Sequence, residues 1–222
     1  MIVTIDGPAG AGKSSIARLA ATRLGFAFLD TGAMYRCVTH AALQQTRSQD
    51  AADPWSDPER LLQIAEGCQI DFDDGRVLLN GEDVSDAIRT PEVTRHIRFA
   101  ADHPQVRTRL NVQQRRIAAG QDIVTEGRDQ GTEVFPDAEC KIFLTASPEV
   151  RAQRRQQQLA ASGKQVQLEE VLADQNRRDL EDRLREVGRL RPAEDAVVVN
   201  TDGLQPDEVL EKVLQIVRQT AT

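Results

Sequence analysis

Aromatic residues and cysteines are scarce in this sequence. Aromatic side chains make up 4% of the 222 residues, and the three cysteines, Cys37, Cys68 and Cys140, lie far apart without a C-x-x-C pair. An odd number of widely spaced cysteines argues against a disulfide framework. We therefore expect buried thiols in a reducing compartment.

The sequence also lacks long apolar runs and metal-ligand spacings. No apolar stretch approaches the length of a membrane-spanning helix, and Ile2 enters a predicted core strand directly after Met1, which argues against a signal peptide. His40, His96 and His103 are not spaced as metal ligands, so no transition-metal site is predicted. These absences favour a cytoplasmic protein without a membrane partner.

Positive charge is in short supply and is carried almost entirely by arginine. The formal net charge is -7, and the pI near 5.1 argues against a general nucleic-acid partner. Of the 28 basic residues, 24 are arginine, whose planar fork of donors suits phosphate and carboxylate groups. Genomic base composition is an equally good explanation of the count, so the positions of the arginines are more informative than their number.

The first motif is a glycine-rich loop near the start of the chain. Gly7-Pro8-Ala9-Gly10-Ala11-Gly12-Lys13-Ser14-Ser15 fits the pattern G-x-x-x-x-G-K-[ST] of a phosphate-binding loop. Residues 2–5 predict a strand before the loop, and residues 16–21 predict a helix after it. In such a loop the backbone N–H groups bind phosphate oxygens, Lys13 reaches the β- and γ-phosphates, and the Ser14 hydroxyl holds Mg²⁺. The sequence therefore predicts a nucleoside triphosphate site.

Buried strands and helices alternate along most of the chain. The pattern predicts a parallel sheet within a single α/β domain of residues 1–222. The five predicted core strands are residues 2–5, 26–29, 123–125, 141–144 and 196–200.

A block of about residues 55–100 interrupts this alternation. It contains a short helix beginning at Pro58, a β-hairpin signal at Asp73-Asp74-Gly75, and a further helix beginning at Pro91. After the block, His103-Pro104 predicts the start of another helix. We interpret the block as a small inserted subdomain on the substrate side.

Two helices with arginines follow in the region of about residues 147–190. Charged side chains share one face of each helix, namely Arg151, Arg154 and Arg155 on the first, and Arg178, Asp182 and Arg185 on the second. The second helix is expected to bury Leu168, Val171 and Leu172. A solvated, salt-bridged face is the usual meaning of such a stripe. Because the segment Ala161-Ser162-Gly163-Lys164 predicts a hinge between two arginine faces, we favour a mobile lid over the transferring phosphate.

Two further polar motifs come directly after predicted strands, at the sheet edge where open α/β proteins bind ligands. They are Asp30-Thr31-Gly32-Ala33-Met34-Tyr35-Arg36 and Glu126-Gly127-Arg128-Asp129-Gln130-Gly131-Thr132. The N-K-x-D and D-x-x-G elements of switch GTPases are not in place, and no strand ends in the acid pair of motor ATPases. A small-molecule kinase remains, and an acceptor phosphate would explain Arg36, Arg107 and Arg128.

Together these motifs resemble the bacterial cytidylate kinase family. The likeness also includes Val134-Phe135-Pro136-Asp137-Ala138 and the stripe of Arg178-Asp179, Asp182 and Arg185, and it extends nearly from end to end. The resemblance implies transfer of the γ-phosphate of ATP to CMP, with dCMP as a second acceptor and Mg²⁺ as the required ion. It also implies a P-loop three-layer fold with a five-stranded parallel sheet, an inserted subdomain on the acceptor side and an arginine-rich lid.

The same resemblance implies a role for individual residues. Lys13, Arg128, Arg178 and Arg185 are expected to be catalytic. On the donor side, Arg154 and Arg155 are expected to bind ATP together with the glycine loop. On the acceptor side, Asp30 is expected at the sheet edge, Thr31 and Tyr35 beside the cytosine, and Arg107 and Asp129 in contact with the base. Asp182 is expected to bind the ribose, and Arg36 the acceptor phosphate. Acceptor and transferring phosphates are expected to be bound by Arg128, Arg178 and Arg185.

The sequence departs from the family pattern at two positions near the acceptor. Arg98 stands where the family has a small hydroxyl residue, and Gln130 stands where it has an apolar one. A uridylate or other small-acceptor kinase therefore remains an alternative, as does a nucleotide-binding module without turnover. We expect a monomer.

Overall fold

The structure is a computed structural model that describes residues 1–46, 54–73, 75–161 and 163–220. Contacts divide the chain into two compact units. The first consists of Met1–Phe28 with Gly120–Thr222, and the second of Leu29–Ala119. The boundaries of the inserted subdomain and of the lid stay predictions. Two predicted features include residues outside the described ranges, namely Asp74 of the hairpin turn and Ser162 of the hinge.

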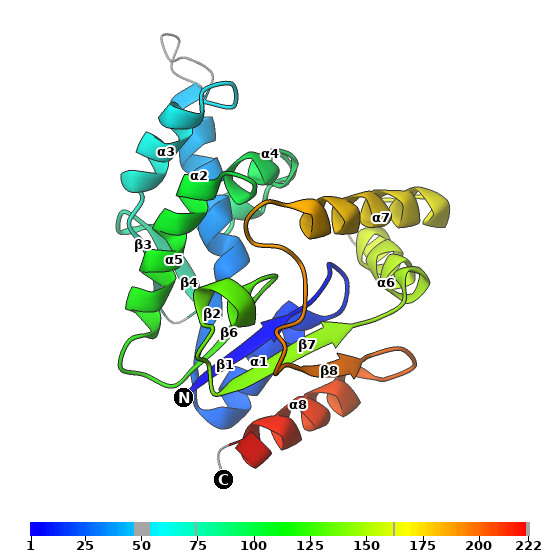
Figure 1. The fold of residues 1–222 in the computed structure, drawn as a ribbon. Helices are drawn as coiled ribbons and strands as arrows, with labels where there is room; N and C mark the ends of the chain where they lie inside the picture. The colour runs from blue at the N-terminus through cyan, green and yellow to red at the C-terminus, as the bar shows by residue number, and fades with distance from the viewer. Residues whose placement is uncertain (47–53, 74, 162, 221–222) are drawn as a thin grey trace. The chain divides into compact units, whose positions relative to one another are not determined.

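A five-stranded sheet has the strand order β2-β6-β1-β7-β8 (Figure 1); four of its strands belong to the first unit, and the boundary between the units falls within β2. The strands are β1 (Ile2–Asp6), β2 (Ala27–Asp30), β6 (Ile123–Gly127), β7 (Cys140–Thr145) and β8 (Val197–Asn200). Parallel pairing joins β1 to β6, β1 to β7, and β7 to β8, which confirms the predicted α/β fold. In this register Asp6 lies opposite Gly127, so the phosphate-binding loop begins beside the end of β6.

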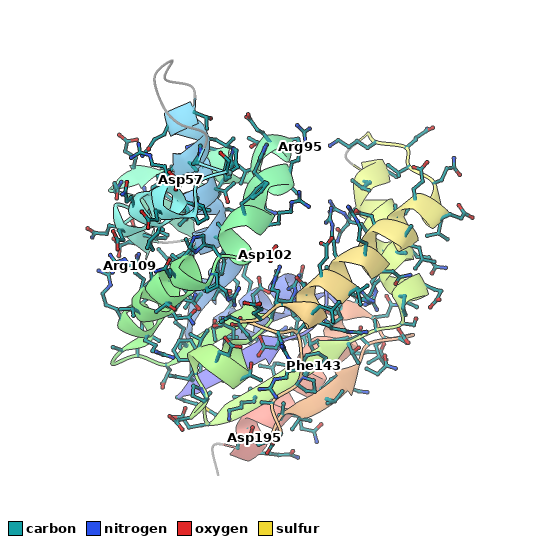
Figure 2. All side chains as sticks on the ribbon, turned by 45° about the horizontal axis from the view of Figure 1, so that its top comes forward. Asp57, Arg95, Asp102, Arg109, Phe143 and Asp195 are labelled. Atoms are coloured by element: carbon teal, nitrogen blue, oxygen red, sulfur yellow. The ribbon has the colours of Figure 1, made fainter. Side chains whose placement is uncertain are left out.

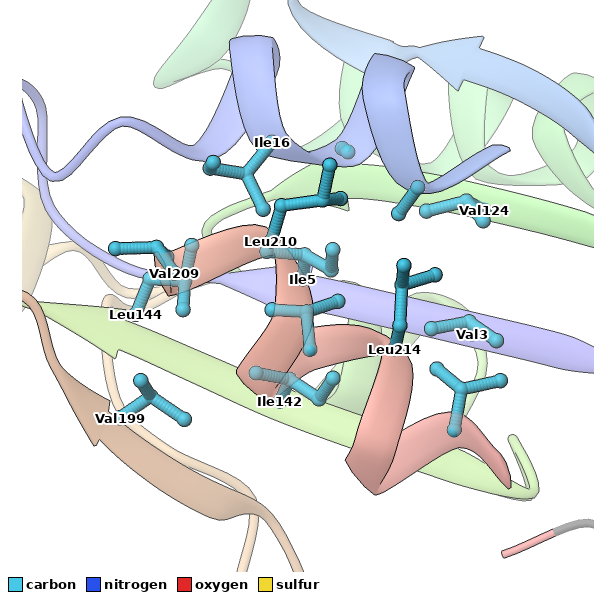
Figure 3. Close-up of a cluster of buried hydrophobic side chains, with 14 of the residues drawn as sticks. Val3, Ile5, Ile16, Val124, Ile142, Leu144, Val199, Val209, Leu210 and Leu214 are labelled. Atoms are coloured by element: carbon cyan, nitrogen blue, oxygen red, sulfur yellow. The ribbon is translucent and has the colours of Figure 1, made fainter. Parts of the chain in front are cut away.

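Apolar side chains from two helices cover the sheet (Figure 3). Helix α1 (Lys13–Leu24) contributes Ile16, and α8 (Pro206–Thr220) contributes Leu210 and Leu214. They pack against Ile5 of β1 and Ile142 of β7, and all five side chains are buried. This cluster fixes the strand that leads into the phosphate-binding loop.

Helix α7 (Leu168–Leu184) has a polar inner face, which the sequence did not predict. Leu168, Val171 and Leu172 were expected to be buried. Val171 is buried, whereas Leu168 and Leu172 are only partly buried. The other buried side chains of the helix are Gln175, Asp179 and Asp182. The periodicity prediction was wrong here because polar contacts, not apolar packing, occupy the inner face.

A buried ion pair joins α7 to α6 (Pro148–Ala161) and to the phosphate-binding loop. Arg151 Nη2 lies 2.6 Å from Asp179 Oδ2, and the two side chains are only 3% and 6% exposed. The same guanidinium donates through Nη1 to the carbonyl of Ala9, at 3.0 Å, and through Nε to that of Ala146, also at 3.0 Å. Gln175 Nε2 donates to the carbonyl of Arg151 at 3.2 Å. One arginine thus ties two helices to the loop backbone.

The second unit consists of helices around a small antiparallel sheet. Its helices are α2 (Thr31–Thr46), α3 (Pro58–Glu66), the short η1 (Ala87–Arg89), α4 (Pro91–Ala101) and α5 (Pro104–Ala118). The strands β3 (Ile70–Asp73), β4 (Arg76–Leu79) and β5 (Glu82–Asp83) pair in that order, β3 with β4 and β4 with β5 both antiparallel, which confirms the predicted hairpin.

The predicted helix starts of the second unit are confirmed, and side-chain caps explain them. The Asp57 carboxylate accepts from the N–H groups of Glu59 and Arg60 where α3 begins (Figure 2). Thr90 caps α4 and His103 caps α5 in the same way, each followed by proline at the first helical position. No helix in the described part of the chain is long and apolar enough to cross a membrane.

The Arg151–Asp179 pair makes a testable contribution to stability. Asp179→Asn is expected to lower the free energy of unfolding by about 3–5 kcal/mol, because it leaves the Arg151 guanidinium buried without its counter-charge. Asp73→Asn is the matched control, since the Asp73–Arg76 pair is more than half exposed and its loss is expected to cost less than about 1 kcal/mol. Urea denaturation measures both, and similar small losses would contradict a stabilising role for the buried pair.

Candidate active site

The phosphate-binding loop joins β1 to α1 and depends on glycine at two positions. A Cβ atom on Gly7 would lie 1.9 Å from the carbonyl oxygen of Leu144, so only glycine fits against β7. Gly12 has a φ of 91°, a left-handed conformation that favours glycine, and it precedes α1 without a side-chain cap. The first N–H groups of α1 therefore have no capping side chain, as an anion-binding helix start requires.

Lys13 is a buried cation at the start of α1. Its side chain is 5% exposed, and Nζ donates to the carbonyl of Pro8 at 3.0 Å. Burial, and then the nearby Arg128, lower the pKa of Lys13 to about 7, against the opposing pull of Glu126, Asp6 and Asp182. A bound phosphate would restore the charge that burial disfavours, so this lysine is suited to bind an anion.

Glu126 is a neighbour of the loop to which the sequence analysis gave no role. It is buried at the end of β6, and Ser14 Oγ donates to its Oε1 at 2.9 Å. In the sequence, Glu126 is a single acid at the end of a predicted strand, whereas the motor-ATPase pattern requires an acid pair. A hydroxyl and a carboxylate side by side fit Mg²⁺, which takes few protein oxygens and keeps water and phosphate ligands.

Arg128 follows β6 and lies in a second group of charges, which are partly or fully buried. Its Nε donates to Asp182 Oδ2 at 2.9 Å, and Arg185 Nη2 lies 2.7 Å from the other oxygen of Asp182. Burial opposes the charge of Arg128, but the Asp182 carboxylate outweighs this effect and raises the pKa of the guanidinium. The structure therefore brings together three of the predicted residues, two cations around one carboxylate.

The remaining predicted arginines of α6 and α7 lie apart from this group. Arg178 is about half exposed and pairs with Asp174 at 2.8 Å. Arg154 donates to the hydroxyl of Thr201 at 2.9 Å and to its carbonyl at 2.7 Å, whereas the exposed Arg155 donates to Gln158. The arginine that contacts the phosphate-binding loop is Arg151, which the sequence placed on the same face but did not select as a site residue.

The second unit gathers a ring and two arginines from two helices, α2 and α5. Tyr35 of α2 lies under the guanidinium of Arg107, which is 5.3 Å from the ring centre and donates to the carbonyl of Ala101 at 2.9 Å. Arg36 Nη1 donates to Thr94 Oγ1 at 2.9 Å and to the carbonyl of Ile88 at 3.2 Å. Sequence reasoning missed Thr94, because its link to Arg36 spans 58 positions.

Asp30 and Thr31 lie at the junction of β2 and α2, as predicted. Asp30 Oδ1 accepts from the N–H of Ala33 at 3.0 Å, and Oδ2 lies 3.6 Å from Arg89 Nη2. Thr31 is buried in the first turn of α2. The Asp30 carboxylate therefore caps the helix that carries Tyr35 and Arg36.

The two departures from the family pattern have different surroundings. Gln130 is fully buried, and its Oε1 accepts from the hydroxyl of Thr125 at 2.8 Å. It is therefore part of the packing beneath the segment that carries Arg128 and the buried Asp129. Arg98 is exposed on α4, with its guanidinium 5.1 Å from the centre of the Phe99 ring.

Comparison with known proteins identifies the family of this chain. A family model described as cytidylate kinase matches residues 3–219. The chain is 63% identical over 219 residues to a cytidylate kinase of Rhodopirellula baltica, covering 99% of this chain and 93% of that protein. It is 46% identical over 218 residues to a cytidylate kinase of Carboxydothermus hydrogenoformans, covering 98% and 97%. The chain belongs to the cytidylate kinase family.

Proposed function

We propose that this protein transfers the γ-phosphate of ATP to CMP, and to dCMP as a second acceptor, with Mg²⁺ as the required ion. The observation that carries the proposal is a second set of phosphate- and ring-binding side chains, Tyr35, Arg36 and Arg107, distinct from the phosphate-binding loop. A nucleotide-binding module would need only the loop. Membership of the cytidylate kinase family supports cytidine as the acceptor base. The expected cytoplasmic location and monomeric state stay predictions.

The donor triphosphate is assigned to the loop of residues 7–15. Its backbone N–H groups and Lys13 hold the β- and γ-phosphates, and Ser14 with Glu126 holds the hydrated Mg²⁺. When bound, the ion neutralises charge on the phosphates. Arg154 and Arg155 stay proposed donor-side residues by resemblance, although Arg154 is engaged with Thr201 in this structure.

The acceptor is assigned to residues named by the resemblance. Arg36 binds its phosphate, Thr31 and Tyr35 lie beside the base, Arg107 and Asp129 contact the base, and Asp182 binds the ribose. In the described structure Asp182 accepts from both Arg128 and Arg185. When the substrates bind, Arg128, Arg178 and Arg185 exchange their carboxylate partners for phosphate oxygens. The exchange is possible because carboxylate and phosphate oxygens are both anionic acceptors for a guanidinium.

Catalysis in this proposal is positioning and charge neutralisation. Phosphoryl transfer passes through a transition state whose charge is spread over three oxygens, so arginines and Mg²⁺ supply most of the stabilisation. Asp6 is one of the carboxylates whose charge acts on Lys13. Both of its oxygens accept backbone N–H groups. It is therefore occupied and unsuited to form a phosphorylated intermediate.

An acceptor panel tests the proposal. With ATP and Mg²⁺, CMP and dCMP are expected to release ADP faster than UMP, AMP or GMP. Lys13→Ala is expected to lower turnover by about 10³-fold, the scale of one electrostatic group on a transferring phosphoryl, while circular dichroism shows the fold retained. A preference for UMP would favour a uridylate kinase, and no turnover with any acceptor would favour a nucleotide-binding module.

The contact between Thr94 and Arg36 predicts a selective effect on the acceptor. Thr94→Val removes a hydrogen bond to a charged group, worth about 1.5–3 kcal/mol, and is expected to raise the KM for CMP about tenfold or more. The KM for ATP is expected to stay within about twofold, since Thr94 belongs to the other compact unit.

Thr108→Val is the matched control for this variant. Its hydroxyl donates to the carbonyl four residues earlier, at 3.1 Å, as that of Thr94 does at 3.0 Å, but among the described residues no hydrogen bond joins Thr108 to an arginine. Near-normal kinetics are expected for the control. An equal rise in the KM for CMP in both variants would remove the assignment of Arg36 to the acceptor phosphate.

A further inference from the structure

Asp6 is a buried carboxylate with a specific pair of partners. It is the last residue of β1, is 4% exposed and directly precedes Gly7 of the phosphate-binding loop. Its Oδ1 accepts from the N–H of Gln130 at 2.9 Å, and its Oδ2 accepts from the N–H of Gly131 at 2.8 Å. Each oxygen therefore holds one backbone group of a segment 124 and 125 positions away in sequence.

The two N–H groups belong to the first two residues of a short π-helical turn, η2 (Gln130–Val134). Within the turn, the carbonyl of Asp129 accepts from the N–H groups of Glu133 at 2.9 Å and of Val134 at 3.3 Å. The first N–H groups of a helix have no partner inside it, so Asp6 supplies the cap. Turns of this π type are rare and frequently occur at functional sites.

Close packing against β1 and β7 also holds the same turn. A Cβ atom on Gly131 would lie 2.9 Å from Thr4 Oγ1 and 3.3 Å from two carbons of Lys141. The backbone at Gly131 therefore lies directly against β1 and β7. Between the end of β6 at Gly127 and the start of η2 at Gln130 the chain has only Arg128 and Asp129, so the carboxylate and the packing together determine where these two side chains begin.

We propose that Asp6 is a positioning residue for acceptor recognition. It fixes the backbone of Arg128 and Asp129, the residues assigned to the acceptor phosphate and base, to the strand that leads into the donor loop. This inference rests on the proposed function. One carboxylate thereby registers the acceptor-binding segment against the donor-binding loop, within the first compact unit.

A role in stability alone is a poor explanation of this carboxylate. Burial raises the pKa of Asp6 to about 7, even though the two N–H groups lower it. An acid whose pKa is raised in the folded state opposes folding at neutral and higher pH, where the unfolded chain would ionise it freely. An uncharged side chain would be cheaper to bury, so the two-point contact to the turn is the feature that requires aspartate.

Asp6→Asn tests the proposal with little change in size. One amide oxygen still accepts an N–H group, but the amide nitrogen cannot accept the other and leaves it without its partner. The variant is expected to lower kcat/KM for CMP by about 10- to 100-fold, as for a lost hydrogen bond to a charged group. Discrimination of CMP from UMP is expected to fall, while the KM for ATP stays within about twofold.

Thr125→Val is the matched control. It removes the buried hydrogen bond between the Thr125 hydroxyl and Gln130 Oε1, at 2.8 Å, but leaves both backbone contacts of Asp6 in place. A comparable loss of thermal stability with near-normal CMP kinetics is expected. If Thr125→Val changed CMP kinetics and discrimination as much as Asp6→Asn, general loosening would be the explanation and the proposal would be overturned.

The outcomes separate this inference from the proposed function. Wild-type protein that phosphorylates no cytidine nucleotide would remove the proposed function itself. Wild-type activity on CMP combined with equal effects of Asp6→Asn on ATP and CMP, or with no effect, would remove only the positioning role. If Asp6→Asn does not fold, Gly131→Ala displaces the same turn through its contact with Thr4, and the same selective loss on CMP is expected.

Discussion

Burial of charge at the carboxyl ends of β1 and β6 constrains the rest of the phosphate-binding unit. An ionised group inside a protein is costly unless an opposite charge or hydrogen bonds compensate it. Asp6 is compensated in part by two backbone N–H groups, which do not offset the effect of burial on its pKa, and Arg128 is compensated by Asp182. Lys13 has a carbonyl partner but a lowered pKa, so its compensation is incomplete until an anion arrives. The unit is thus built to bind phosphate and to keep its other charges in place.

The same constraint explains helix α7. An apolar inner face would leave Arg151 and Arg128 without counter-charges, whereas Asp179 and Asp182 supply one to each. Gln175 packs against the loop at Gly10, where a Cβ atom would come within 3.0 Å of its amide nitrogen. The helix is therefore registered against the phosphate-binding loop through polar contacts, which can exchange partners when a ligand arrives more readily than an interlocked apolar core.

Much of the fold was predictable because its signals are local. The phosphate-binding loop, the strands of the parallel sheet, and the helices that begin at Pro58, Pro91 and Pro104 follow from short motifs, caps and periodicity. The partners of the site residues were not predictable in this way. Thr94 meets Arg36 and Asp6 meets the Gln130 turn only after the chain has folded, and no pattern within either segment marks the contact.

The central claim is that phosphate passes directly from one bound nucleotide to the other; Asp6, one of the carboxylates that act on Lys13, is already occupied by backbone donors. Isotope exchange tests this claim most directly. The protein is incubated with ATP, Mg²⁺ and labelled ADP in the absence of any nucleoside monophosphate. We predict that labelled ATP does not form until CMP is added. Labelled ATP without an acceptor, together with phosphate bound covalently to the protein, would contradict the account.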